Sequence, residues 1–208
     1  ALAISGNELF VGGNFTQANV GGVVVAANYV AKFDLQTNSW SALGSGSGNG
    51  LSHQVLALAI KGHEVFVGGD FFQANVGGAT VTANNVAKFN KATNTWGVLS
   101  ADTGVGVNGR VSALALNGDD LFVGGNFFAA NVGGTMSILV RGIAKFNTQN
   151  NIWSALGSDG GRGVDSSVTV LTVRNDELYV GGTFMQVNID GPPVTAKYVA
   201  KFNLLTNA

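Results

Sequence analysis

Three glycine-rich segments carry side chains suited to binding. They read "GSGSGNGLSHQ" at 44–54, "SADTGVGVNGR" at 100–110 and "GSDGGRGVDSS" at 157–167. Imidazole, guanidinium, amide and carboxylate groups on loops can hold a small ligand or a peptide by hydrogen bonds and ion pairs. The simpler interpretation is that these segments are solvated connectors. The candidate ligand-binding residues are His53, Gln54, Arg110, Asp165 and Ser167, and Asp102, Asp159 and Arg162 lie in the same segments.

The sequence shows no recognisable catalytic or metal-binding pattern. It has no cysteine, which excludes disulfides, thiolate zinc sites and cysteine nucleophiles. No Ser-His-Asp arrangement is evident, and "GSGSGNG" at 44–50 does not open a helix, as a phosphate-binding glycine loop would. Asp159 and Asp165 are separated by glycines, but they lack the EF-hand spacing. We therefore expect no catalytic residue, no metal site and no cofactor.

Arg141 stands out because it breaks the regularity of the chain. It belongs to "TMSILVRG" at 135–142, the segment that holds the one extra residue of an internal repeat. Departures from a repeat are common on binding loops. The sequence therefore predicts a contact residue at Arg141, with an ordinary surface arginine as the alternative.

The repeat itself supplies the elements that must position these residues. The string "ELFVGGNF" at 8–15 returns as "EVFVGGDF" at 64–71, "DLFVGGNF" at 120–127 and "ELYVGGTF" at 177–184. Ala-Lys-Phe follows at 31–33, 87–89, 144–146 and 200–202, so the steps are 56, 57 and 56 residues. We assign the repeats to 1–54, 55–110, 111–167 and 168–208.

Each repeat has the pattern of short β-strands. In the second repeat the predicted strands are "VLALAI" at 55–60, "EVFVGG" at 64–69, "NVAKFN" at 85–90 and "TWGVLS" at 95–100. Apolar, β-branched and aromatic residues cut by Gly and Asn favour strands, and four antiparallel strands per repeat are typical of a β-propeller blade. We predict an all-β fold and a single propeller over 1–208. Its last blade is incomplete, because no fourth tryptophan-bearing strand is present.

The repeat number leaves the closure of the propeller open, since closed propellers have about four to eight blades. Three interpretations stand. Missing blades elsewhere in a longer protein complete a larger ring, the chain is a four-bladed ring with a frayed last blade, or two copies complete a ring by self-association.

Residues that recur in every repeat are expected to be structural. The lysines should pack their stems on the blade with the amine in water, and Trp40, Trp96 and Trp153 should pack on outer strands. The recurring asparagine should form a turn. A sugar site in each blade, with Phe72 and Phe128 as aromatic partners, is the alternative. The recurring residues are Lys32, Lys88, Lys145 and Lys201, and Asn19, Asn75, Asn131 and Asn188.

The repeat resembles known propeller repeats. "FNKATNTWGVL" at 89–99 resembles the kelch repeat, and "VSALALNGDDLFVGGNF" at 111–127 resembles the bacterial delta-60-type repeat. The resemblance implies a propeller, and kelch-type members include partner-binding scaffolds and a minority of oxidases. Kelch units often carry arginine at the positions of Gln54, Arg110 and Ser167, and only one of these is arginine here. The copper-oxidase members need cysteine, which this chain lacks.

Composition restricts the partners. Charged residues make up 11% of the chain and the net charge is −1, so no basic face for nucleic acid is expected. No apolar run is long enough to predict a membrane span. A surface built largely from Asn, Ser, Thr, Gln and Gly is common in secreted proteins, so a secreted or cell-surface location is expected.

The sequence thus predicts a non-catalytic binding or structural scaffold that presents loops to a protein or glycan ligand. The alternative is a carbohydrate-binding propeller with one site per blade. A weaker alternative is part of a longer propeller enzyme whose catalytic groups lie outside this chain.

Overall fold

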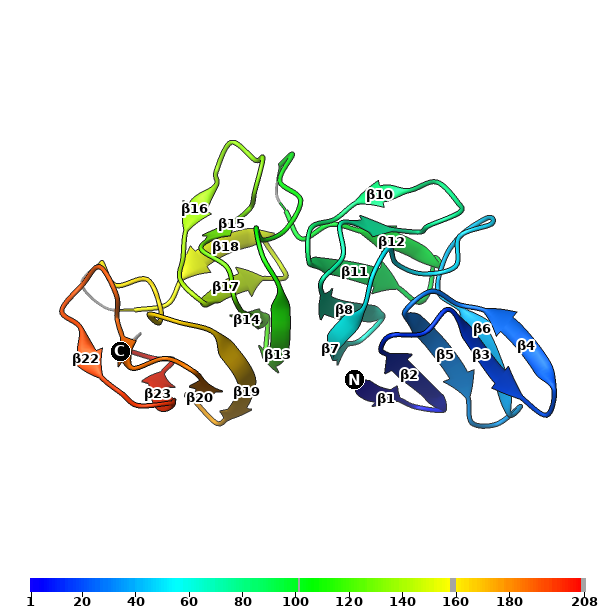
Figure 1. Ribbon diagram of the computed structural model, residues 1–208, viewed down its shortest axis with the longest axis horizontal. Coiled ribbons are helices and arrows are strands. Elements are labelled where there is room, and N and C mark those ends of the chain that lie inside the picture. The colour runs from blue at the N-terminus through cyan, green and yellow to red at the C-terminus, as the bar shows by residue number, and fades with distance from the viewer. Residues whose placement is uncertain (101, 158–159, 207–208) are drawn as a thin grey trace. The chain divides into compact units, whose positions relative to one another are not determined.

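The computed structural model describes residues 1–100, 102–157 and 160–206. The chain divides into two compact units, Ala1–Val98 and Leu99–Ala208. The described residues form strands and turns and no helix, as predicted (Figure 1). None of them forms a helix that is long and apolar enough to cross a membrane.

The first unit contains two four-stranded antiparallel sheets. In each sheet the strands neighbour one another in chain order, except that a small hairpin is inserted between the second strand and the third. The first sheet comprises β1 (Leu2–Ser5), β2 (Glu8–Gly12), β5 (Val30–Asp34) and β6 (Ser39–Ala42). The second comprises β7 (Val55–Lys61), β8 (Glu64–Gly69), β11 (Val86–Asn90) and β12 (Thr95–Gly97).

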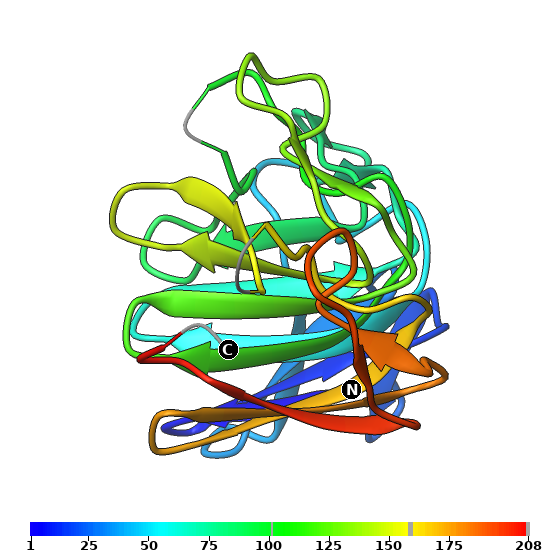
Figure 2. The ribbon, with the colours of Figure 1, turned by 90° about the vertical axis from the view of Figure 1, so that its left-hand side faces the viewer.

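The second unit repeats this plan, and its adjacent green strands β13 and β14 can be followed in Figure 2. Its four-stranded sheet comprises β13 (Val111–Asn117), β14 (Asp120–Gly125), β17 (Ile143–Asn147) and β18 (Ile152–Ala155). The other sheet has three strands among the described residues, β19 (Val168–Arg174), β20 (Glu177–Gly182) and β23 (Val199–Asn203). The predicted strands therefore agree with the structure to within a few residues.

The hairpin between the second and third strands was not predicted from the sequence, which indicated only a turn at the recurring asparagine. Most of its strands are only two residues long, so no alternation of apolar and polar residues reveals them. The four hairpins are β3 (Gln17–Val20) with β4 (Val23–Ala26), β9 (Gln73–Ala74) with β10 (Val81–Thr82), β15 (Ala129–Ala130) with β16 (Ile138–Leu139), and β21 (Gln186–Val187) with β22 (Val194–Thr195).

The recurring glycine pair has two separate packing roles. The first glycine faces the next sheet, since a Cβ on Gly124 would lie 2.6 Å from Cγ1 of Val168 and 3.0 Å from Cδ1 of Leu171. The second glycine lies opposite a β-bulge, and Gly125 pairs with Val111 where the register shifts before Ala113. Both the close approach and the bulge are reasons for glycine in a strand.

Aromatic side chains fill the space between strands and between sheets. Phe10, Phe66 and Phe122 are buried. The cross-strand pair of Phe146 and Trp153 has ring centroids 5.1 Å apart, and its counterparts in the first two sheets have 4.9 and 5.2 Å. The tryptophans are therefore packing residues, as predicted.

Candidate functional site

Asp165, one of the predicted ligand-binding residues, caps a hairpin insert. Its Oδ1 accepts hydrogen bonds from the main-chain nitrogens of Met185 (2.8 Å) and Gln186 (3.1 Å). Asn108 does the same for Phe128 and Ala129 at 2.9 Å each. Ser52 holds the corresponding place in the first unit, accepting from two main-chain nitrogens at 3.1 Å. One carboxylate oxygen of Asp165 therefore serves the scaffold, and the other remains available for a ligand.

Gln54, Arg110 and Ser167 also occupy equivalent positions. The main-chain oxygen of each accepts a hydrogen bond from the residue that follows the glycine pair, at 2.9 to 3.1 Å. These are the positions where the kelch arginine would stand. His53 is exposed and stacks on Tyr29 with ring centroids 5.7 Å apart. His53 and Gln54 belong to the first unit, and Arg110, Asp165 and Ser167 to the second.

Three of the four recurring asparagines are structural clamps. Asn75, Asn131 and Asn188 are buried and have positive φ angles between 56° and 61°. The side-chain nitrogen of Asn75 donates to the carbonyl of Ala79 at 3.0 Å, and its oxygen accepts from the nitrogen of Ser45 at 2.9 Å. The side chain thus joins a hairpin insert to the glycine-rich segment before it. This agrees with the predicted turn role and leaves these amides unavailable to sugars.

Asp102 strengthens the same junction in the second unit. Its carboxylate accepts from Oγ1 and N of Thr135 (2.7 and 2.8 Å), from N of Gly104 (2.9 Å) and from Nδ2 of Asn131 (3.0 Å). These hydrogen bonds, the Thr135 hydroxyl first among them, hold the pKa of Asp102 far below its usual range. Asp159, named with it above, lies outside the described residues. No group of described residues has the composition and proximity of a metal site.

The four recurring lysines form ion pairs instead of projecting only into water. Each pairs with the acidic residue that begins the second strand of its own sheet. The pairs are Lys32–Glu8 (2.7 Å), Lys88–Glu64 (3.1 Å), Lys145–Asp120 (3.2 Å) and Lys201–Glu177 (2.5 Å). They are therefore scaffold residues, as their recurrence indicated.

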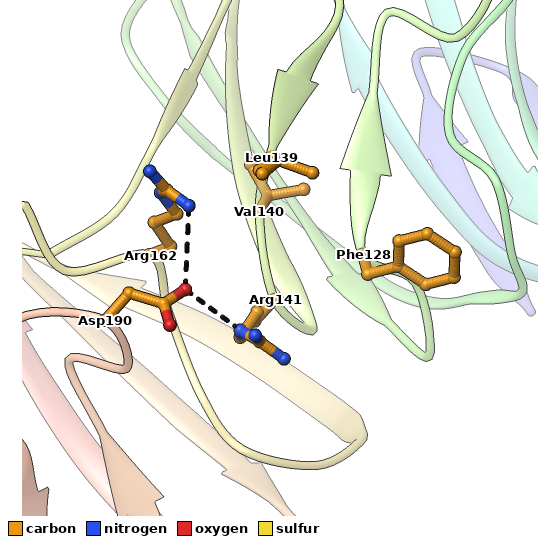
Figure 3. Close-up of a pocket in the computed structure, with 6 residues that line it drawn as sticks. All are labelled: Phe128, Leu139, Val140, Arg141, Arg162 and Asp190. Atoms are coloured by element: carbon orange, nitrogen blue, oxygen red, sulfur yellow. Dashed lines mark hydrogen bonds and ion pairs between the residues drawn. The ribbon is translucent and has the colours of Figure 1, made fainter.

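Arg141 lies in a charged cluster with Arg162 and Asp190 (Figure 3). Oδ2 of Asp190 is 3.1 Å from Nε of Arg141 and 3.7 Å from a terminal nitrogen of Arg162. The backbones of the two arginines are locked together, because N of Arg141 donates to O of Arg162 at 2.7 Å and O of Arg141 accepts from N of Val164 at 2.9 Å. Two arginines and one carboxylate leave a net positive charge.

Two shallow cavities flank Arg141, each of about 130 Å³. Phe128 and Arg141 belong to both linings, and Phe128 is 64% exposed. In Figure 3, Arg141 lies between Asp190 and Phe128, and Leu139, Val140 and Arg162 are drawn above it. The first cavity is completed by Leu139, Val140, Arg162 and Asp190, and the second by Asn126, Phe127, Gly142, Val164, Asp165 and Ser166.

The positions of Arg162 and Asp190 hold neutral residues in the other repeats that contain them, and the position of Arg141 holds asparagine in the first two repeats and Lys197 in the fourth. In the first unit Asn28 makes the same main-chain bridge as Arg141, and its Nδ2 donates to Oδ1 of Asn49 at 2.9 Å. Asp190 has a φ of 70° at a hairpin turn where the other three repeats have Gly21, Gly77 and Gly133, also with positive φ. Arg141 and Arg162 were noted from the sequence and Asp190 was not, although this break in a series of glycines points to it.

No protein-family model matches the chain, and no curated protein matches it. Solved structures do share its fold. The computationally designed Ika4 protein is 16% identical with a TM-score of 0.54, over 94% of this chain and 88% of that one. The WD40 domain of Pan2 from Neurospora crassa is 10% identical with a TM-score of 0.51, over 99% of this chain and 48% of that one. WD40 domains are propellers. The fold is propeller-like.

A third match is the extracellular domain of a protein described as a hybrid two-component system from B. thetaiotaomicron. It is 13% identical with a TM-score of 0.54, over 88% of this chain and 19% of that one. The chain thus spans about a fifth of that structure and about half of the Neurospora domain. At these identities the similarity concerns the fold alone.

Proposed function

We propose that this propeller-like chain is a non-catalytic binding module of a secreted or cell-surface protein, built from kelch-like repeats. Its ligand is a protein or a glycan. The observation that carries the proposal is the cluster of Arg141, Arg162 and Asp190 beside two cavities. Recurring polar residues serve the scaffold, whereas these three depart from the repeat and lie together. In a repeat protein, contacts with partners are made where the repeats differ.

The pKa shifts of two carboxylates support their assignment to the scaffold. Partial burial raises the pKa of Glu8, but hydrogen bonds from Lys32 and Lys91 outweigh it and the pKa is lowered. A hydrogen bond from Lys201 lowers the pKa of Glu177. These groups are kept ionised as scaffold ion pairs, whereas general acids and bases have pKa values near the working pH.

Binding arrays test the proposal. The wild-type chain and an Arg141→Asn/Arg162→Asn double variant would be applied to a glycan array and a peptide array. The variant carries the amide pair that Asn28 and Asn49 form in the first unit, so it is expected to fold. We expect a ligand that wild type binds and the variant loses. If wild type binds nothing, or the variant binds equally well, the proposal is wrong.

A lectin-like module with several sites is the second candidate. Phe72 and Phe128 occupy equivalent positions and are 59% and 64% exposed, as an aromatic platform for a sugar would be. Thr16 and Met185 hold the same place in the other repeats, so at most two repeats offer this aromatic. A stoichiometry above one glycan per chain would favour this candidate.

A further inference from the structure

We propose that the two cavities beside Arg141 bind an acidic oligosaccharide, with a sugar carboxylate on the two arginines and a neighbouring ring against Phe128. This inference rests on the proposed function and names its ligand class.

The positive charge of the two arginines favours an anionic ligand. The fold does not need ions here, since Asn28 and Asn49 make the equivalent connection with neutral amides. Placing two guanidinium groups together is unfavourable unless anions neutralise them. Asp190 supplies the one carboxylate that forms ion pairs with these two arginines among the described residues. The carboxylate of Asp165 lines the second cavity, but it caps a hairpin insert and forms no ion pair with either arginine. A ligand carboxylate in the first cavity would therefore supply the second ion-pair partner.

The terminal nitrogens of Arg141 are hydrogen-bond donors that suit a ligand carboxylate. Arg141 uses Nε for Asp190, and its two terminal nitrogens make no hydrogen bond or ion pair with the part of the chain that the structure describes. Arginine presents its donors in a planar fork that matches a carboxylate. In Figure 3 this free end of Arg141 points away from Asp190, on the side of Phe128.

The lining of the second cavity suits the hydroxyl groups of a sugar. Asp165 has one carboxylate oxygen beyond the one that caps the hairpin. Asn126 offers an exposed carboxamide, and Ser166 a hydroxyl that also shares a hydrogen bond with the hydroxyl of Thr183 (3.0 Å). These groups both accept from and donate to sugar hydroxyls. The exposed ring of Phe128 provides the apolar surface on which the C–H face of a sugar ring packs.

The main-chain hydrogen bonding beside Arg141 favours a sugar over an extended peptide as the ligand. A peptide gains most of its affinity on a sheet protein from unpaired main-chain groups. Here the main-chain nitrogens of Val140, Arg141 and Gly142 already donate within the unit, at 2.7 to 3.1 Å. Recognition must therefore come from side chains that suit carboxylates and hydroxyls.

The test is calorimetric titration with trigalacturonate at low salt, with its fully methylated ester as the neutral matched ligand. We expect wild type to bind trigalacturonate at least about tenfold more tightly than the ester, since an ionic hydrogen bond of ordinary strength corresponds to a factor of that size. The Arg141→Asn/Arg162→Asn variant should lose this preference. Phe128→Ser should weaken both ligands severalfold, whereas Phe72→Ser, the matched exposed phenylalanine, should leave binding unchanged. Thermal melts establish that each variant folds.

Equal binding of acid and ester, or a preference that survives in the double variant, would overturn the inference. If trigalacturonate and mannuronate and guluronate trimers all fail to bind while an array reveals a neutral glycan or a peptide that needs Arg141, the ligand class is wrong and the proposed function stands. If no ligand depends on Arg141, both are wrong.

Discussion

The indole nitrogen of Trp153 donates a hydrogen bond of 2.7 Å to the main-chain oxygen of Leu99. Trp96 makes the same bond to Leu43, at 2.9 Å, in the first unit. Both bonds are buried and connect the fourth strand of one sheet to the segment that leaves the sheet before it. The bond thus fixes the connection that enters the glycine-rich segments at 44–54 and 100–110.

Trp153→Phe should destabilise the second unit because it leaves a buried carbonyl without its donor. The expected loss is about 1–3 kcal/mol of unfolding free energy. Trp40→Phe is the matched control, since the Trp40 bond to Asn19 is longer (3.2 Å) and exposed, and its effect should be smaller. Urea denaturation followed by circular dichroism measures both. Equal losses for the two variants would contradict the assigned role.

We expect acid to weaken the junction between the hairpin insert and its glycine-rich segment, because the carboxylate of Asp102 holds it. The pKa of Asp102 is lower in the folded chain than in the unfolded one. In an unfolded chain the pKa of aspartate is about 3.9. Its contribution to stability is therefore complete above that value and is lost as the pH falls below it. Thermal melts between pH 7 and pH 2.5 should show a shallower acid-induced fall for Asp102→Asn than for wild type. Parallel curves would show that Asp102 contributes nothing.

Asp190 occupies a backbone position that favours glycine, so its substitutions should test local strain. At φ 70° a residue with a Cβ is strained, and glycine is not. Asp190→Gly restores the residue found in the other repeats, so stability should change by less than about 1 kcal/mol even though two exposed ion pairs are lost. Asp190→Ala keeps the Cβ without the polar group that eases this conformation, and it should be about 1 kcal/mol less stable than Asp190→Gly. Chemical denaturation compares the two variants, and the opposite order would contradict the assigned strain.

Much of the scaffold could be predicted because it recurs. Gly124, Lys145 and Trp153 have counterparts at the same step in other repeats, and a residue that recurs with the fold has a packing reason. The hairpin inserts could not be predicted, because two-residue strands such as Ala129–Ala130 carry no periodic signal. Their main-chain nitrogens donate hydrogen bonds to residues about 20 positions earlier in the chain, such as Asn108, and no local pattern reveals such partners.

The candidate site was predicted in part for the same reason. Arg141 and Arg162 could be identified from the sequence as charged residues in variable segments. Their proximity could not be predicted, because they are 21 positions apart and no local pattern connects them. The parallel bridge between Arg141 and Gly163 brings them together. Asp165 shows the converse case, since a carboxylate in a variable loop has a scaffold role that Ser52 and Asn108 share.

Gly124→Ala should be more damaging than another glycine substitution in a strand, because the space at Gly124 belongs to the next sheet. A Cβ there would lie 2.6 Å from Val168 and 3.0 Å from Leu171, so the two sheets would have to separate. Overpacking of this kind costs about 1–3 kcal/mol. Gly97→Ala is the control, since its Cβ would meet only the side chain of Lys88 at an ordinary 3.7 Å, and alanine there should be neutral or slightly stabilising. Denaturation midpoints compare the two variants. If Gly124→Ala were as stable as Gly97→Ala, the glycine pair would have no role in sheet packing, and its recurrence would need another cause.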